Sequence, residues 1–256
     1  MRFLAIGDII GRPGRACLTR LLPALRQEYA LDLVIANGEN AAGGLGLTPE
    51  TAREILAAGV DVITSGNHIW AHREIIPDLE GDDLPLLRPL NYPPGVPGRG
   101  FLIHPQAIVV NLIGRTFMGN YDCPFRAMDS LLAGLPERPR VVIVDFHAEA
   151  TSEKMALGRY LDGRVSAVLG THTHVGTIDT RILPGGTAYV TDIGMTGPVD
   201  SVIGDDTESV LRRFLTIIPG RLGVASGPAT LHGVIVEADP LTGHATSIER
   251  IQEEGA

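Results

Sequence analysis

The chain has 256 residues, of which 44% are hydrophobic and 20% are charged, as in an ordinary folded globular protein. Its formal net charge of −9 argues against a broad surface for long nucleic acid, but a small anionic substrate is still compatible if bound cations set the local field. With only two cysteines, Cys17 and Cys123, the sequence excludes a disulfide framework, and we expect both thiols to be reduced.

The membrane classes are also excluded by the distribution of apolar residues. No apolar stretch approaches transmembrane length, and the N-terminal run Phe3–Ile6 is too short for the core of a signal peptide. We therefore expect a cytoplasmic protein that has no membrane partner. The length fits one α/β domain or two small ones.

Strands and helices alternate through most of the chain, which is typical of an α/β fold. Five apolar runs predict buried strands: 2–7, 33–38, 60–66, 140–146 and 166–169. Helical spacing and start signals predict three helices between these runs: 11–29, 48–59 and 151–163. The connections between the early strands are long enough for right-handed crossovers, so we expect those strands to be parallel.

The pattern changes after Gly185. Asp205 or Asp206 is expected to cap a further helix, and three more strands are predicted at 188–191, 230–236 and 246–250. A turn at 240–243 joins the last two, which predicts a second, more antiparallel sheet packed on the first. The Pro/Gly-rich stretch 89–100 is interpreted as a loop and not as a domain linker.

Residues that can bind metals follow the five early strands, at or just after the end of each. They comprise two carboxylates, two amides and four imidazoles: Asp8, Glu39, Asn40, Asn67, His68, His147, His172 and His174. Ligands of open α/β sheets bind at the carboxyl ends of the strands. His172 and His174 are two positions apart and share one side of an extended backbone. The set is large enough for two metal ions, with Glu39 as the best-placed bridging carboxylate.

A two-metal site of this kind favours displacement at phosphorus, because two ions can hold the attacking and the leaving oxygen. Mixed nitrogen and oxygen ligands suit iron, manganese, cobalt or zinc, and argue against magnesium, which prefers oxygen and water. We expect two divalent transition-metal ions per chain, with iron or manganese ahead of zinc or cobalt. A metal-bound hydroxide between them would be the nucleophile.

Five motifs carry a resemblance to a known group of enzymes: Gly7–Gly11, Asn37–Ala41, Ser65–Trp70, Asp145–Glu149 and Gly170–His174. The chain resembles the calcineurin-like metallophosphoesterase superfamily, and its similarity to the bacterial YmdB-like branch runs essentially end to end. This resemblance implies a four-layer αββα fold with mixed sheets and helices outside, in a single domain over residues 1–256. It also implies a di-metal phosphodiesterase acting on small phosphodiesters, foremost 2′,3′-cyclic nucleotides, with a regulatory role in RNA turnover.

The chain departs from the wider superfamily at three positions. Ile10 stands where a histidine is usual, Glu39 replaces the bridging aspartate, and Ile69 replaces an acid after the Gly-Asn-His motif. The resemblance implies that Asn40 fills the gap left by the missing histidine.

By resemblance, Glu39 bridges the two ions and each ion has three further ligands. One ion would have Asp8, Asn40 and His174, and the other Asn67, His147 and His172. His68 would lie outside the metal shell, where it donates to the phosphate or protonates the leaving ribose oxygen.

Several residues also have a plain structural interpretation. Asp8 can cap the helix that follows it, Asn67 can hold a turn, and His147 can be a hydrogen-bonded core histidine. Asp145 can support the site or simply be buried. The four histidines outside the motifs are interpreted as structural, and Trp70 as a core residue: His72, His104, His232 and His244.

Two other functions are also compatible with the sequence. The glycines of Gly7-x-x-x-Gly11-x-x-Gly14, with Asp32 downstream, suggest a Rossmann-type dinucleotide oxidoreductase, although the spacing is not GxGxxG. A non-catalytic regulatory protein that binds metal and nucleotide is the third class. A homo-oligomer is also left open. Three loops are candidate walls for a base pocket: 45–47, 91–93 and 194–197.

Overall fold

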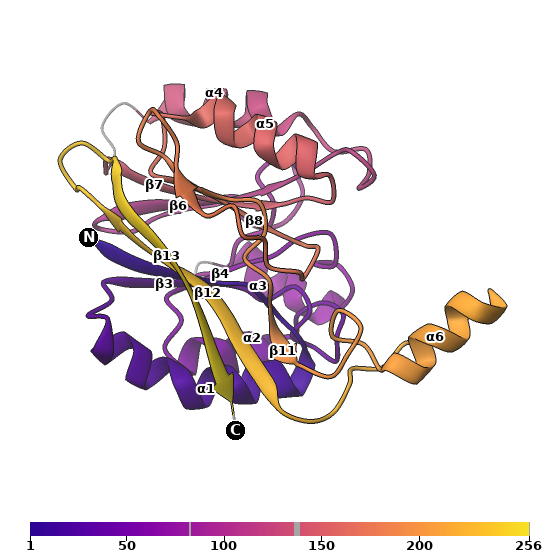
Figure 1. Cartoon of the computed structure of the whole chain (residues 1–256). Coiled ribbons are helices and arrows are strands. Elements are labelled where there is room, and N and C mark those ends of the chain that lie inside the picture. The colour runs from indigo at the N-terminus through magenta and orange to yellow at the C-terminus, as the bar shows by residue number, and fades with distance from the viewer. Residues whose placement is uncertain (82, 136–138, 256) are drawn as a thin grey trace.

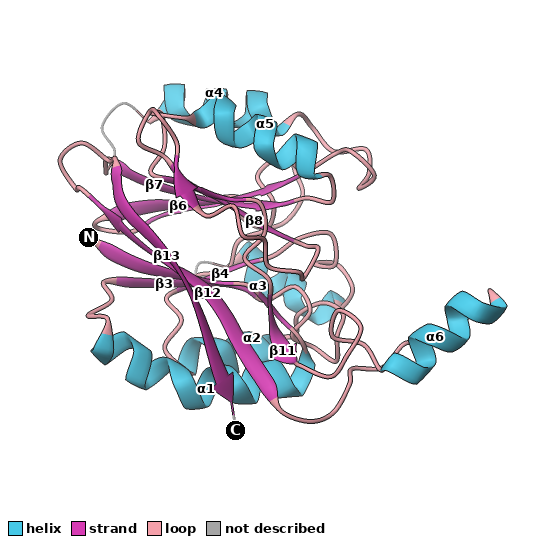
Figure 2. Cartoon of the chain, in the orientation of Figure 1, coloured by secondary structure: helices cyan, strands magenta, loops and turns pink. Residues whose placement is uncertain are grey.

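The computed structural model of the protein describes residues 1–81, 83–135 and 139–255. Two β-sheets lie face to face, and helices cover their outer faces (Figures 1 and 2). Helices α1 (Gly11–Glu28) and α2 (Pro49–Ala57) cover the first sheet, while α4 (Pro124–Gly134) and α5 (Thr151–Leu161) cover the second. The predicted αββα arrangement is therefore confirmed.

The first sheet has the order β2-β11-β12-β1-β3-β4, with β13 paired to β12. Its strands are β1 (Arg2–Ile6), β2 (Asp8–Ile9), β3 (Leu33–Asn37), β4 (Val62–Thr64), β11 (Met195–Pro198), β12 (Ala229–Ala238) and β13 (Ala245–Gly255). β1, β3 and β4 run parallel to one another, as predicted, whereas β12 is antiparallel to β1.

The second sheet has the order β5-β6-β7-β8-β10-β9. Its strands are β5 (Phe101–Ile103), β6 (Ala107–Ile113), β7 (Val141–His147), β8 (Ala167–Thr171), β9 (Arg181–Ile182) and β10 (Ala188–Val190). The four central strands β6, β7, β8 and β10 are parallel. Their carboxyl ends therefore lie at one edge of the sheet.

The prediction that the late strands form a sheet of their own is wrong. β12 and β13 join the first sheet through β1, and β10 joins the second through β8. The five early strands are in turn divided between the two sheets. Periodicity locates a strand, but its partner is chosen by long-range packing, and β12 is buried along most of its length beside β1.

The core consists of three apolar layers. In β1, alternation sends Phe3 and Ala5 into the layer between the two sheets, and Leu4 and Ile6 into the layer beneath α1 and α2. A third layer lies between the second sheet and α4 and α5. The sheet ends that carry the polar residues are thus fixed relative to each other by packing on both faces of each sheet.

The remaining elements are short or peripheral. A 3₁₀ turn, η1 (Arg73–Ile75), leads into α3 (Ile76–Glu80), and α6 (Thr207–Thr216) projects from the body of the protein (Figure 1). Of the two aspartates predicted to cap α6, it is Asp206 whose side chain accepts a hydrogen bond from the Ser209 amide. Among the described residues, no helix has the length and apolar character needed to cross a bilayer.

Substitution of Gly158 tests how tightly α5 packs on the second sheet. A Cβ atom at this position would lie 2.6 Å from Cε2 of Tyr189, a buried ring whose hydroxyl is hydrogen-bonded to Thr191. Because the ring is held at both ends, we expect Gly158→Ala to lower the free energy of unfolding by about 1–3 kcal/mol in urea titrations. Gly134→Ala is the control, since no atom of the described residues beyond its own helix and chain neighbours lies within 4 Å of its Cβ position. It should be neutral or stabilise by up to about 1 kcal/mol, and equal losses in both variants would contradict this packing.

Candidate metal centre

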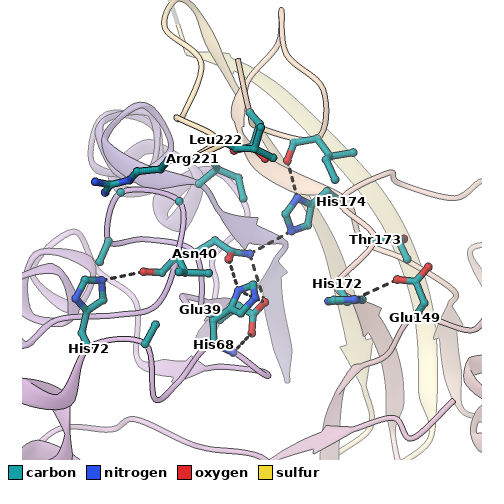
Figure 3. Close-up of a pocket in the computed structure, with 18 of the residues that line it drawn as sticks. Glu39, Asn40, His68, His72, Glu149, His172, Thr173, His174, Arg221 and Leu222 are labelled. Carbon is teal, nitrogen blue, oxygen red and sulfur yellow. Dashed lines mark hydrogen bonds and ion pairs between the residues drawn. The ribbon is translucent and has the colours of Figure 1, made fainter. Parts of the chain in front are cut away.

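The eight predicted site residues come together where the ends of the two sheets meet. Figure 3 shows five of them: Glu39, Asn40, His68, His172 and His174. The first sheet supplies both carboxylates, both amides and one imidazole: Asp8, Glu39, Asn40, Asn67 and His68. The second sheet supplies the other three imidazoles: His147, His172 and His174.

One group of ligand atoms surrounds Nε2 of His147. This nitrogen lies 3.0 Å from Oε1 of Glu39, 3.1 Å from Oδ1 of Asn67 and 3.0 Å from Nδ1 of His172. The ligand atoms of Glu39, His147 and His172 all lie within 4.8 Å of one another. The two oxygens can only accept hydrogen bonds, so this convergence is more readily satisfied by a cation than by hydrogen bonds.

A second group surrounds Asp8, which is fully buried. Within the described part of the chain, its Oδ1 atom has no hydrogen-bond partner. Nε2 of His174 lies 3.7 Å from this oxygen and 3.1 Å from Nδ2 of Asn40. An orphaned carboxylate oxygen in a buried site is costly unless a cation offsets it.

The electrostatics of the cluster also fit bound cations. Burial raises the pKa of Asp8 to about 6, although His174 and His147 oppose that rise. Burial alone would also raise the pKa of Glu39, but the charge and hydrogen bond of His147 lower it to about 2. Burial alone would lower the pKa of His147, but the Glu39 carboxylate raises it to about 9. The cluster therefore stabilises positive charge, and its oxygen and nitrogen donors fit two divalent ions.

A hydrogen-bond chain orients His147. Its Nδ1 lies 3.0 Å from the hydroxyl of Thr171, which in turn donates to Asp145 over 2.7 Å. Thr64 and Asn37 donate to the other oxygen of Asp145. Since the Thr171 hydrogen is used on Asp145, the hydroxyl accepts from Nδ1–H of His147, and Nε2 is the nitrogen that faces Glu39 and would bind a metal ion in place of its proton. Asp145 thus supports the site and is not merely buried.

His172 is oriented by a residue that sequence reasoning missed. Oε2 of Glu149 lies 3.1 Å from Nε2 of His172, so Nδ1 of this imidazole is left to face His147. Glu149 closes the motif that begins at Asp145, and its position two residues after a site histidine was the available signal.

The loop that carries His172 and His174 is held in a strained form. Both residues have positive φ, 98° and 64°, which is uncommon for residues other than glycine. Between them, Thr173 donates to Asp192 from its amide over 3.1 Å and from its hydroxyl over 2.7 Å. Asp192 is in turn paired at 2.7 Å with Lys154, the only lysine of the chain, whose side chain is 1% exposed. Sequence reasoning missed this pair, because α5 alone does not show what its lysine faces.

His68 lies beside the cluster. Its Nδ1 is 3.0 Å from Oδ1 of Asn40 and 3.5 Å from Oε1 of Glu39, and its backbone amide donates to Glu39. Burial lowers the pKa of His68, since the neighbouring Glu39 carboxylate only partly opposes that effect. Neutral imidazole is therefore favoured at this position.

Five of the eight site residues line one side of a cavity of about 670 Å³: Glu39, Asn40, His68, His172 and His174. The other wall is built by the loop after Glu39 and by the segment around α6: Ala42, Gly43, Gly44, Leu45, Ala71, His72, Ile203, Asp205, Arg213, Arg221 and Leu222. The volume is within the roughly 300–1,000 Å³ of pockets that enclose small ligands.

The expectations for the cavity wall and for the structural histidines need correction. His72 was expected to be only structural, yet it lines the cavity, and its Nε2 donates to the Leu45 carbonyl over 2.9 Å. Of the three predicted wall loops, only the one containing Leu45 lines the cavity. In the second loop, Tyr92 is buried and donates to Gly66, while its ring stacks on Trp70 at 5.9 Å, which confirms Trp70 as a core residue.

The glycines that suggested a dinucleotide fold have a packing role instead. A Cβ at Gly7 would clash with the backbone oxygen of Gly194, and one at Gly14 would clash with that of Thr196. β11 therefore runs directly against the turn where a dinucleotide phosphate would have to lie. The Rossmann interpretation does not fit this packing.

Comparisons with known proteins agree with the geometry. A family profile described as "YmdB-like protein" matches residues 4–251. The chain is 49% identical over 256 residues to the 2′,3′-cyclic-nucleotide 2′-phosphodiesterase of Bacillus subtilis (strain 168), a match that covers 98% of this chain and 96% of that protein. It is 36% identical over 263 residues to a putative phosphatase/phosphodiesterase of Mycoplasma genitalium, covering 98% and 92%.

Solved structures show the same relationship. A hypothetical protein from Thermus thermophilus superposes with a TM-score of 0.94 at 48% identity and full coverage of both chains. The calcineurin-like phosphoesterase YfkN from Bacillus subtilis has a TM-score of 0.63 at 12% identity, covering 99% of this chain and 90% of that one. The latter shows that the fold is shared.

Lys154 tests the support of the histidine loop. Lys154→Met keeps the length of the side chain but leaves Asp192 buried without its cation. We expect the free energy of unfolding to fall by about 3–5 kcal/mol, the usual cost of removing one partner of a buried pair. Arg53→Met is the control, because it breaks the more exposed Arg53–Asp78 pair and should cost at most about 1 kcal/mol. Similar losses in the two variants would show that the buried Lys154–Asp192 pair contributes no more to stability than the more exposed Arg53–Asp78 pair.

Proposed function

The chain belongs to the YmdB-like family, and on that premise we propose that it is a metal-dependent phosphoric diester hydrolase that opens 2′,3′-cyclic nucleotides. The observation that carries this proposal is the convergence of Glu39, His147 and His172 beside the orphaned oxygen of Asp8. Residues 1–256 would act as one metallophosphoesterase domain.

The two groups of ligand atoms suggest how the ions are held. One ion would be bound by Asp8, Asn40 and His174, the other by Asn67, His147 and His172, and Glu39 would bridge them. Iron or manganese is our first choice, because mixed nitrogen and oxygen donors suit these ions. When bound, the ions supply an activated water and stabilise the charge that develops on the phosphate.

The cavity residues would position the substrate and its proton. In the present arrangement Nδ2 of Asn40 faces His174, and Oδ1 faces Nδ1 of His68. If the side-chain amide of Asn40 is flipped, its oxygen and its NH₂ group exchange positions. The oxygen then faces Asp8 and His174, and the NH₂ group donates to Nδ1 of His68. Neutral His68 then carries its hydrogen on Nε2, from which it can be donated to the phosphate or to the leaving ribose oxygen.

The first test is metal content combined with Glu39→Gln. The purified protein should contain close to two transition-metal equivalents per chain by elemental analysis, and chelation should remove metal and activity together. Glu39→Gln preserves shape but removes the charge that offsets two cations. Turnover should therefore fall by more than the roughly 10–100-fold that loss of an outer-shell partner causes.

Glu237→Gln is the matched control, because its carboxylate pairs with Arg2 away from the cavity. It should retain metal and turnover. A fully active protein without metal, or an unchanged Glu39→Gln variant, would contradict the proposed site.

His68→Ala separates metal binding from proton transfer. Both metals should stay bound, while kcat for a 2′,3′-cyclic nucleotide should fall by roughly 10²–10⁴-fold, the usual range for a positioned acid. The loss should be smaller for a p-nitrophenyl phosphodiester, whose leaving group needs little protonation. His104→Ala, at the turn between β5 and β6, is the control and should change neither rate. An equal loss on both substrates would indicate phosphate binding instead, and loss of metal would make His68 a ligand.

A further inference from the structure

The cavity extends well beyond the metal ligands. In Figure 3, Glu149 and His172 lie at one side of it, while Arg221 and His72 lie at the other, with Asn40 and His68 between them. The far wall comes from α6 and from the segment after it, which contribute Arg213, Arg221 and Leu222. This wall holds no predicted metal ligand, so its chemistry needs a separate explanation.

The two arginines of this wall are available for a ligand. Neither Arg213 nor Arg221 makes a hydrogen bond or an ion pair with its side chain within the described ranges 1–81, 83–135 and 139–255. Elsewhere in this acidic chain, arginines such as Arg15, Arg53 and Arg164 are paired with carboxylates. Two unpaired guanidinium groups at one cavity wall, in a protein of net charge −9, are suited to bind an anion.

The wall is not uniformly positive. Asp205 also lines the cavity, and it offsets part of the charge of Arg213. Arg221 stands next to Leu222, and the apolar residues Leu45 and Ile203 line the same cavity. The far wall thus offers an apolar surface and positive charge. These complement the base and the phosphate of a nucleotide, respectively.

We propose that Arg213 and Arg221 bind a second phosphate group of the substrate, attached to the 5′ oxygen of a nucleoside 2′,3′-cyclic phosphate. This inference rests on the proposed function. In ribose, the 5′ carbon points away from the 2′ and 3′ oxygens, so a substrate whose cyclic phosphate lies at the metal ligands directs its 5′ group to another part of the cavity. The arginines supply positive charge there, and Leu45, Ile203 and Leu222 supply an apolar surface for the base.

A 5′ phosphate has two sources, which share this chemistry. It is a terminal monoester in a free nucleotide, and it is an internucleotide diester at the 3′ end of a short RNA. The terminal group carries more negative charge, and the diester carries a further nucleoside. Substrates of both kinds therefore distinguish the two sources.

The experiment compares three substrates with the metal-loaded enzyme: adenosine 2′,3′-cyclic phosphate, its 5′-phosphorylated form, and the dinucleotide adenylyl-adenosine that ends in a 2′,3′-cyclic phosphate. A charge-assisted contact should raise kcat/KM by about tenfold for a substrate with the second phosphate. The preference should shrink as salt is added, because the contact lies at an open cavity wall. A larger gain for the free nucleotide or for the dinucleotide identifies the source.

Arg213→Ala and Arg221→Ala should each reduce the ratio of kcat/KM between the phosphorylated and the unphosphorylated substrate. Arg212→Ala is the matched control, because it removes the same charge from α6 but Arg212 does not line this cavity. Binding without turnover gives a second readout. In calorimetry, adenosine 3′,5′-bisphosphate should bind about tenfold more tightly than adenosine 3′-phosphate, and both arginine variants should lose that difference.

The outcomes separate the two proposals. Equal kcat/KM for all three substrates, or a preference that Arg213→Ala and Arg221→Ala leave intact, would overturn the second phosphate site while the proposed function stands. Failure to hydrolyse any of the three substrates would instead overturn the proposed function.

Discussion

The burial of Asp8 and Glu39 is the constraint on which the rest of the site depends. Both carboxylates are fully buried, and an isolated buried charge costs several kcal/mol. The cost can be offset only by positive charge or by hydrogen bonds brought to the same place. The first sheet carries these acids, and the imidazoles that face them, His147, His172 and His174, come from the second. The site therefore exists only when the two sheets are packed together.

This dependence explains the tight packing at the sheet ends. A side chain at Gly66 would meet the carboxylate of Glu39 and the ring of His147, so the loop after β4 has no room for a Cβ atom. Gly7 and Gly14 likewise let β11 lie against the first turn. A small error at these positions would move the polar side chains of one sheet relative to those of the other. The glycines thus serve the geometry of the site.

The sequence predicted the fold class and a set of polar residues that the structure brings together, but not every strand pairing around them. Polar residues follow the apolar strands, so local patterns were sufficient to single out Asp8, Glu39 and His147, which the structure buries side by side. The pairing of β12 with β1 and of β10 with β8 depends on contacts that are distant in the chain. No local signal reports them.

Several elements and one cavity wall were not predicted from the sequence. β6 and α4 are the longest of these elements. In β6 the apolar run is interrupted by Asn111, which is buried. Its side-chain oxygen accepts a hydrogen bond from the backbone amide of Ser65, which follows β4 of the other sheet. The cavity wall that contains Arg213 and Arg221 could not be predicted from sequence patterns, because only the folded structure brings α6 to the cavity. Lys154 is another such case, since nothing near it in sequence identifies Asp192 as its partner.

The position of Lys154 has a practical consequence for chemical labelling. The chain has one lysine, and its amine is enclosed between α5 and the end of β10 and hydrogen-bonded to Asp192. The one lysine side chain is therefore shielded from amine-directed reagents in the folded protein. Acylation of Lys154 would report the opening of the protein beside its histidine loop, so the chain carries a built-in probe of local unfolding at its own site.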